Sequence, residues 1–106
     1  MASTEAKSEP VYVYKIFFGL HGQLSDNVTI NRTVLRGILA NSYVDGYTIH
    51  EGSGFWEGES EPSDVVIFIS DHCIDDELRL VASQYKKQTG QLEVWITRTV
   101  EALTIV

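Results

Sequence analysis

Two segments with helical periodicity lie among segments typical of strands, and their order constrains the fold more than any other feature. Residues 31–42 (NRTVLRGILANS) carry apolar side chains at helical spacing, with Asn31 placed as the N-cap. A second helix has one apolar face, made by Ile74, Leu78, Val81, Ala82 and Tyr85. Asp71 or Asp75 would cap the start of this helix, and Gly90 would end it.

Strand-like segments surround both helices. Residues 11–20 are β-branched and aromatic, and residues 64–70 are almost entirely apolar, which is typical of a strand covered on both faces. We expect a loop at residues 21–27 and a glycine-rich reversal at residues 52–56. Further strands are expected within residues 43–52 after a turn at Asp45–Gly46, in residues 91–98, and as a short last strand in residues 102–106.

This order predicts an α+β, ferredoxin-like βαββαβ fold with a short C-terminal strand. We expect a flexible tail at residues 1–10 and a single domain at residues 11–106. In such a fold the helices cover one face of the sheet and leave the other open. The alternation places four aromatic side chains on the open face, which are Tyr12, Tyr14, Phe18 and Trp95. An open face with these rings predicts a homo-oligomer with ligand sites between subunits.

Composition and charge narrow the class of protein. The chain is 43% hydrophobic and 22% charged, which is typical of a globular protein. Its formal net charge of −7 disfavours binding to nucleic acids and anionic membranes. The charge suits a cationic ligand, a basic protein partner or solubility alone. The N-terminal residues lack the apolar core of a signal peptide, and a single cysteine, Cys73, fits a reducing compartment, so we expect a cytoplasmic protein.

Familiar catalytic motifs are absent from the sequence. There is no GxGxxG, P-loop, nucleophile elbow or HExxH pattern. His21, His50 and His72 are scattered, and Cys73 has no partners at zinc spacing, so we expect neither a metal nor a cofactor. The segment GLHG at residues 19–22 suits either an anion-binding turn or a plain turn from strand to loop.

An acidic ladder precedes the apolar strand. Glu57, Glu59 and Glu61 occupy alternate positions and follow Phe55 and Trp56. In a strand these three carboxylates would project to one side. One interpretation is a charged edge that prevents aggregation. The other is a cation site, where the rings supply apolar surface and nearby glycines allow close approach.

The segments VYVYKIFF, DGYTIHEGSGFWEG, ESEPSDVVIFI and LEVWITRTVEALTIV together resemble the small phage-encoded S-adenosylmethionine lyases, once described as hydrolases. The resemblance spans roughly residues 10–106. It implies a PII-like trimer that cleaves S-adenosylmethionine into 5′-methylthioadenosine and homoserine lactone, in the host cytoplasm as a counter-defence protein. The substrate's own carboxylate displaces the thioether, so the protein mainly positions the reacting atoms.

The resemblance also implies site residues. Glu61 matches the family glutamate before the strand and would hold the substrate's ammonium group, with Glu59 as the second candidate. The residues expected to contact the substrate are Trp56, Phe55, Gly54, Ser63 and Tyr14. Two alternatives remain open: a non-catalytic PII-like module that binds a nucleotide-like ligand between subunits, and an acidic phage protein that inhibits a host protein.

Overall fold

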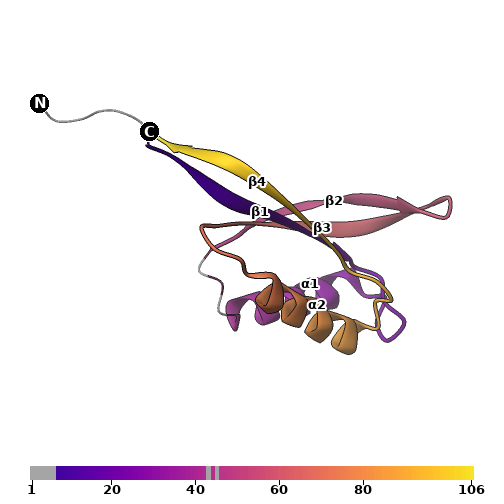
Figure 1. The fold of residues 1–106 in the computed structure, drawn as a ribbon. Helices are drawn as coiled ribbons and strands as arrows, with labels where there is room; N and C mark the ends of the chain where they lie inside the picture. Colours follow the sequence, from indigo (N-terminus) through magenta and orange to yellow (C-terminus); the bar gives the residue numbers. More distant parts are fainter. Residues whose placement is uncertain (1–6, 43, 45) are drawn as a thin grey trace, which may run out of the picture.

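The computed structural model describes residues 7–42, 44 and 46–106, which form one four-stranded sheet and two helices. The elements in chain order are β1 (Lys7–Gly19), α1 (Val28–Ala40), β2 (Thr48–Trp56), β3 (Glu59–Ser70), α2 (Asp75–Thr89) and β4 (Trp95–Ile105). The sheet has the order β2-β3-β1-β4, and every neighbouring pair is antiparallel. Both helices lie on one face of this sheet (Figure 1). The α+β ferredoxin-like fold is therefore confirmed.

The molecule is elongated, with principal extents of 59 × 29 × 20 Å. The start of β1 and the end of β4 pair from Lys7↔Ile105 onward and form a two-stranded arm that extends past the helices. The β2–β3 hairpin extends from the opposite end of the molecule (Figure 1). The two ends of the sheet thus project beyond the helical layer in opposite directions.

The core lies between the helices and one set of alternating strand residues. Its fully buried members include Tyr14, Ile16, Phe18, Val66, Phe68, Leu35, Leu78 and Tyr85. The prediction that Tyr14 and Phe18 occupy the open face is wrong, because they are 1% and 0% exposed beneath the helices. Tyr12 is also partly buried against this core, so of the four predicted aromatic residues only Trp95 is on the open face. The other β1 set faces outward and includes Lys15, whose charge is exposed to solvent.

Both helices have different starts from those expected. Asn27, not Asn31, is the N-cap of α1, and its side chain accepts a hydrogen bond from the Ile30 amide at 3.0 Å. Asn31 is 1% exposed and its side-chain amide donates to the carbonyl oxygens of Leu20 and Ser25. At the start of α2, Ile74 occupies the cap position without a side-chain hydrogen bond, so neither predicted aspartate caps this helix. Gly90 ends α2 at φ 75°, as predicted.

Strand boundaries also differ from the expectation. The glycine-rich segment 52–56 continues β2, and the chain reverses at Glu57–Gly58, with φ values of 49° and 81°. Positive φ at both positions is typical of a tight hairpin turn. The two expected C-terminal strands are a single strand, β4, because it pairs with β1 over its whole length. Lys7–Pro10, expected in the tail, belong to β1, and Asp45 of the expected turn lies outside the described residues.

Candidate functional site

Glycines line the open sheet face next to the β2–β3 hairpin and leave their positions on that surface without side chains. Gly52 and Gly54 of β2 pair with Ser63 and Glu61 of β3, and Gly19 of β1 pairs with Ser63 from the other side. A Cβ atom added at Gly52 or Gly54 would meet its nearest neighbour only at 3.9 or 3.7 Å. The backbone around Ser63 and Glu61 is therefore open to a close approach by another molecule.

Glu61 is held above Gly19. The Glu61 Oε1 atom accepts a hydrogen bond from the His21 backbone amide at 3.2 Å. The Glu61 carboxylate and the Gln91 side-chain amide converge on Gly19 so closely that a Cβ atom there would clash with both. Gly19 is therefore required for this arrangement, and the carboxylate has a defined position on the open face.

Tyr85 supports the same strand end from the helical layer. Its hydroxyl donates a hydrogen bond to the Gly19 carbonyl oxygen. Burial, together with the negative charges of Asp64 and Glu61, raises the pKa of Tyr85 well above its usual range. The phenol thus stays protonated and remains a donor, which fixes the backbone beneath the Glu61 carboxylate.

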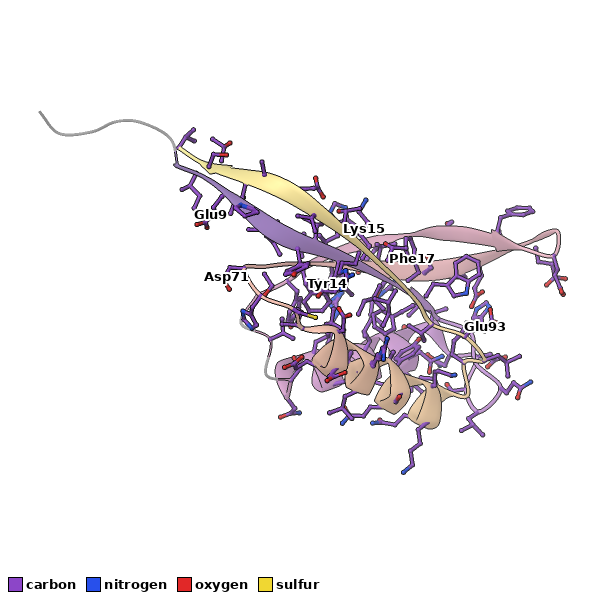
Figure 2. All side chains as sticks on the ribbon, in the orientation of Figure 1. Glu9, Tyr14, Lys15, Phe17, Asp71 and Glu93 are labelled. Atoms are coloured by element: carbon purple, nitrogen blue, oxygen red, sulfur yellow. The ribbon has the colours of Figure 1, made fainter. Side chains whose placement is uncertain are left out.

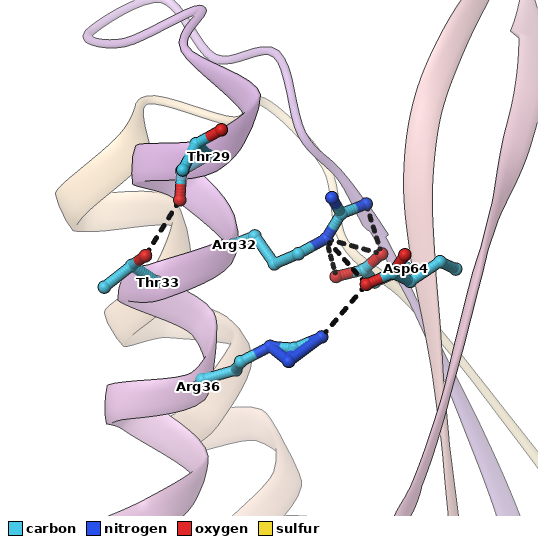
Figure 3. A network of polar contacts seen from close by, with 6 residues as sticks. Thr29, Arg32, Thr33, Arg36 and Asp64 are labelled. Carbon is cyan, nitrogen blue, oxygen red and sulfur yellow. Dashed lines mark hydrogen bonds and ion pairs between the residues drawn. The ribbon is translucent and has the colours of Figure 1, made fainter.

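A buried ion pair lies on the opposite face of β3. Asp64 is 0% exposed and accepts hydrogen bonds from Arg32, from Nε at 3.1 and 3.3 Å and from Nη2 at 3.0 Å (Figure 3). Glu51 joins Arg32 to Arg36, with N–O distances of 3.5 and 3.3 Å. Sequence reasoning missed this pair, although an aspartate at the start of an otherwise apolar strand was a visible signal. The pair fastens α1 to the strand that carries Ser63.

The backbone amides of residues 20–25, which follow the first glycine of the GLHG segment, already have acceptors within the chain. The amides of residues 20–25 donate, in order, to the Pro62 carbonyl, the Glu61 carboxylate, and the carbonyls of Ser25, Gly90, Thr89 and Thr89. Of the two interpretations of the GLHG segment, the structure therefore supports the plain turn from strand to loop. This turn places the His21 amide against Glu61.

The predicted site residues divide into three groups. Glu61, Gly54 and Ser63 lie together on the glycine-lined surface. Glu59 and Trp56 pair two residues farther along the exposed hairpin, and the Trp56 side chain lies outside the described part of the structure.

Phe55 and Tyr14 lie elsewhere. Phe55 is 75% exposed and alternates to the opposite side of β2 from Gly54. Tyr14 lies in the core, where its hydroxyl accepts a hydrogen bond from the Ile74 amide at 3.1 Å. Burial raises the pKa of Tyr14 to about 12. Tyr14 is therefore separated from Glu61 by the thickness of the sheet.

An aromatic pair lies on the open face beside the glycine-lined surface, and the sequence did not reveal it. Phe17 of β1 and Trp95 of β4 are directly opposite each other, and Val65 of β3 is on the other side of Phe17. Trp95 Nε1 donates to Glu93 Oε2 at 3.1 Å. Figure 2 shows Phe17 and Glu93 toward the hairpin end of the molecule, away from Glu9 on the arm. Correct assignment of the alternation in β1 would have revealed Phe17.

Other kinds of site have little support within the described residues. No three His, Cys, Asp or Glu side chains in residues 7–42, 44 and 46–106 gather where they could hold a metal ion. No helix in these ranges is long and apolar enough to cross a bilayer. A groove of about 690 Å³ lies between α1 and α2 and is lined by Gly37, Asn41 and Lys87 among others, but it lacks the convergent carboxylate found at Gly19.

Comparison with known proteins shows similarity in fold, but no similarity in sequence that would assign a family. No family model and no curated protein matches the sequence. The solved structure of CPII, a nitrogen regulatory PII-like protein from Thiomonas intermedia K12 bound to ADP, AMP and bicarbonate, is 13% identical. The match covers 94% of this chain and 97% of CPII, with a TM-score of 0.53.

Two further solved structures show how broad the similarity is. A phage S-adenosylmethionine lyase in its apo state is 13% identical over 89% of this chain and 87% of its own, with a TM-score of 0.51. The de novo designed protein Foldit4 is 16% identical over 86% of this chain and 97% of its own, with a TM-score of 0.54. The chain therefore has a PII-like arrangement of the ferredoxin-like fold. Because a designed protein matches equally well, the fold alone does not assign an activity.

Proposed function

We propose that this protein is an S-adenosylmethionine lyase that works as a homotrimer, with its substrate between subunits. The observation that carries the proposal is the Glu61 carboxylate, fixed over Gly19 by the His21 amide on an open, glycine-lined surface. A carboxylate in this setting suits a substrate ammonium group, because a charge-assisted hydrogen bond needs a preorganised partner. The Ser63 hydroxyl lies beside it as a second acceptor.

The substrate's charge agrees with this surface. S-adenosylmethionine carries a sulfonium, an ammonium and a carboxylate, so its net charge is positive, whereas the chain carries a formal net charge of −7. Glu59, Glu61 and Glu93 all belong to the hairpin end of the molecule. Their combined field attracts a cation and repels phosphate groups.

The proposed reaction is an intramolecular displacement. A carboxylate oxygen of the substrate attacks its own γ-carbon and forms the C–O bond of the lactone. The bond from this carbon to sulfur breaks, and its electron pair neutralises the sulfonium as methylthioadenosine leaves. Neither a proton nor a water is consumed, so the contribution of Glu61 is to orient the amino-acid arm for attack.

The open sheet face supplies the proposed subunit contacts. Beyond the Phe17 position, its apolar side chains include Val13, Ile67 and Ile69, and Ile69 is 54% exposed. An apolar face of this kind is typical of a surface that another copy covers. Because Glu61 and Ser63 are on the same face, a neighbouring subunit would cover the glycine-lined surface and the substrate on it.

The reaction is tested by incubating the purified protein with S-adenosylmethionine and following the products at early times. Methylthioadenosine and homoserine lactone are expected together. In ¹⁸O-water the first-formed lactone should be unlabelled, because its ring oxygen comes from the substrate. If labelled homoserine forms before any lactone, the protein is a hydrolase and the lyase proposal is wrong.

Substitutions on the glycine-lined surface test the role of Glu61. Glu61→Gln should reduce turnover by about tenfold or more, because it removes a charge-assisted contact worth about 1.5–3 kcal/mol. Glu57→Gln, in the hairpin turn, removes the same charge and serves as the matched control, with little expected effect. Gly54→Ala should keep the fold but obstruct the substrate, since its Cβ atom would make ordinary contacts within the chain. Equal turnover in wild type and Glu61→Gln would show that the acidic ladder is an edge-strand feature.

A second candidate function is a non-catalytic PII-like module. It is favoured by the structural likeness to CPII, whose structure contains ADP, AMP and bicarbonate. Calorimetry separates the two functions. Binding of S-adenosylmethionine without product formation, or tight binding of ADP, would favour the module.

A further inference from the structure

The aromatic pair Phe17–Trp95 differs from the other exposed apolar residues in its position. Phe17 is 37% exposed and Trp95 is 54% exposed, and the two residues are cross-strand partners on the open face. Gly19, where the Glu61 carboxylate rests, is two residues from Phe17 on the same strand and therefore projects to the same face. Two residues along a strand span about 7 Å, so one small molecule can reach both the rings and the carboxylate.

The tryptophan ring is restrained before any ligand binds. Its Nε1 atom donates to Glu93 Oε2, which fixes one edge of the indole while more than half of the residue stays exposed. A restrained ring loses little conformational freedom on stacking, and both indole and phenyl faces favour planar π-systems. On the other side of Phe17 lies Val65, which supplies a further apolar surface.

The charges around this pair select among planar ligands. Glu93 accepts a hydrogen bond from the Trp95 ring, and Glu61 rests above Gly19, two residues from Phe17 along β1. The positive charge of Lys15 lies two residues from Phe17 in the direction away from Gly19. A phosphate group on the glycine-lined surface would therefore be repelled by carboxylates, whereas a neutral or cationic substituent would not be.

We propose that Phe17 and Trp95 form a subsite for the purine ring of a nucleoside that carries a neutral or cationic 5′-substituent and no phosphate. The cationic arm of such a ligand extends to Glu61 and Ser63. The subsite gives the ligand class independently of any reaction; its link to S-adenosylmethionine rests on the proposed function. An alternative occupant is a second copy of the chain, which would bury the two rings in a subunit interface.

The test uses 5′-methylthioadenosine, which has the ring but lacks the charged arm, and AMP, which adds a phosphate. The chain has two tryptophans, so in Trp56→Phe the emission comes from Trp95 alone. Methylthioadenosine should change this emission saturably. By calorimetry on the otherwise unchanged chain, AMP should bind at least tenfold more weakly than methylthioadenosine.

Matched variants locate the binding. Trp95→Ala should weaken methylthioadenosine binding by about fivefold to a hundredfold, the range for loss of one base-stacking contact. Trp95→Phe should retain most of the affinity, because it keeps an aromatic face. Leu80→Ala is the control, since Leu80 has a similar exposure of 55% but lies on α2, outside the open sheet face.

Three outcomes would overturn the subsite: unchanged affinity in Trp95→Ala, equal binding of AMP and methylthioadenosine, or a Trp95→Ala variant whose smaller mass by light scattering places the rings in a subunit interface. Failure of the proposed reaction has a different signature. If S-adenosylmethionine is not cleaved but methylthioadenosine still binds through Trp95, the subsite stands and the lyase assignment fails. If cleavage occurs while Trp95→Ala binds methylthioadenosine normally, the reverse holds.

Discussion

At the scale of single residues, the charge on Asp64 decides how β3 is attached to α1. Its carboxylate is fully buried and raises the pKa of the Arg32 guanidinium through their hydrogen bonds. Asp64→Ala would leave Arg32, which is 26% exposed, without its main partner. We expect the free energy of unfolding to fall by about 3–5 kcal/mol, as measured by denaturant titration.

Glu51 provides the comparison for Asp64. It contacts the same arginine, but its side chain is 58% exposed, so Glu51→Ala should cost about 1 kcal/mol or less. Similar losses for the two variants would show that burial does not strengthen the Asp64 contact.

Two buried tyrosines should make the free energy of unfolding fall as the pH rises into the alkaline range. Burial raises the pKa of Tyr14 from 10.0 to about 12, and burial also raises the pKa of Tyr85. In the unfolded chain both phenols ionise near their ordinary pKa. Their contribution is therefore complete below pH 10. The contribution of Tyr14 is lost as the pH rises from 10 to about 12, and that of Tyr85 also declines as the pH rises above 10.

Denaturant titrations across this pH range would measure the loss, with phenolate absorbance followed in parallel. Tyr14→Phe should show a smaller decline above pH 10 than wild type. Ionisation of both tyrosines near pH 10 in a protein that remains folded would contradict the expectation.

At the scale of secondary-structure elements, one residue lowers the stability of α1 and another raises it. Gly37 lies inside the helix, and a Cβ atom added there would meet nothing within 4 Å. Gly37→Ala should therefore raise the free energy of unfolding by up to about 1 kcal/mol. Asn27→Ala removes the N-cap hydrogen bond to Ile30 and should lower it by about 1 kcal/mol.

Thermal unfolding of the two variants and the double variant would test these signs. The sites are ten residues apart along one helix, so their effects should be close to additive. Destabilisation by Gly37→Ala would contradict the expectation and would mean that the groove between α1 and α2 needs the space that glycine leaves.

The hairpin shows how an element can mislead at the sequence level. Glycines at positions 52 and 54 suggested a reversal, but β3 pairs with that segment and extends it as a strand. Tertiary pairing thus overrides the weak strand preference of glycine. The reversal falls at Glu57–Gly58, so Glu57 leaves the acidic ladder and only Glu59 and Glu61 remain on the strand.

At the scale of the whole molecule, the uncovered sheet face leads to a prediction about assembly. Light scattering at micromolar concentration should give about three times the chain mass of 11.9 kDa. Ile67→Asp places a charge on this face and should lower the mass and abolish ligand binding.

A charge on the other side of the molecule is the control. Leu80 of α2 is 55% exposed, and Leu80→Asp should leave the mass unchanged. A wild-type protein that is monomeric at this concentration would remove the site between subunits and the lyase proposal with it.

The sequence by itself determined the order of elements, both helices and the C-cap at Gly90, because hydrophobic periodicity and the backbone freedom of glycine are local properties. It also indicated Glu61. Tertiary structure decided which set of alternating β1 residues the helices cover, because both sets contain large apolar side chains and only packing distinguishes them. It also brought Gly19 and Gln91 to Glu61 and placed Trp95 opposite Phe17, since residues so distant in sequence meet only through strand pairing and the end of α2.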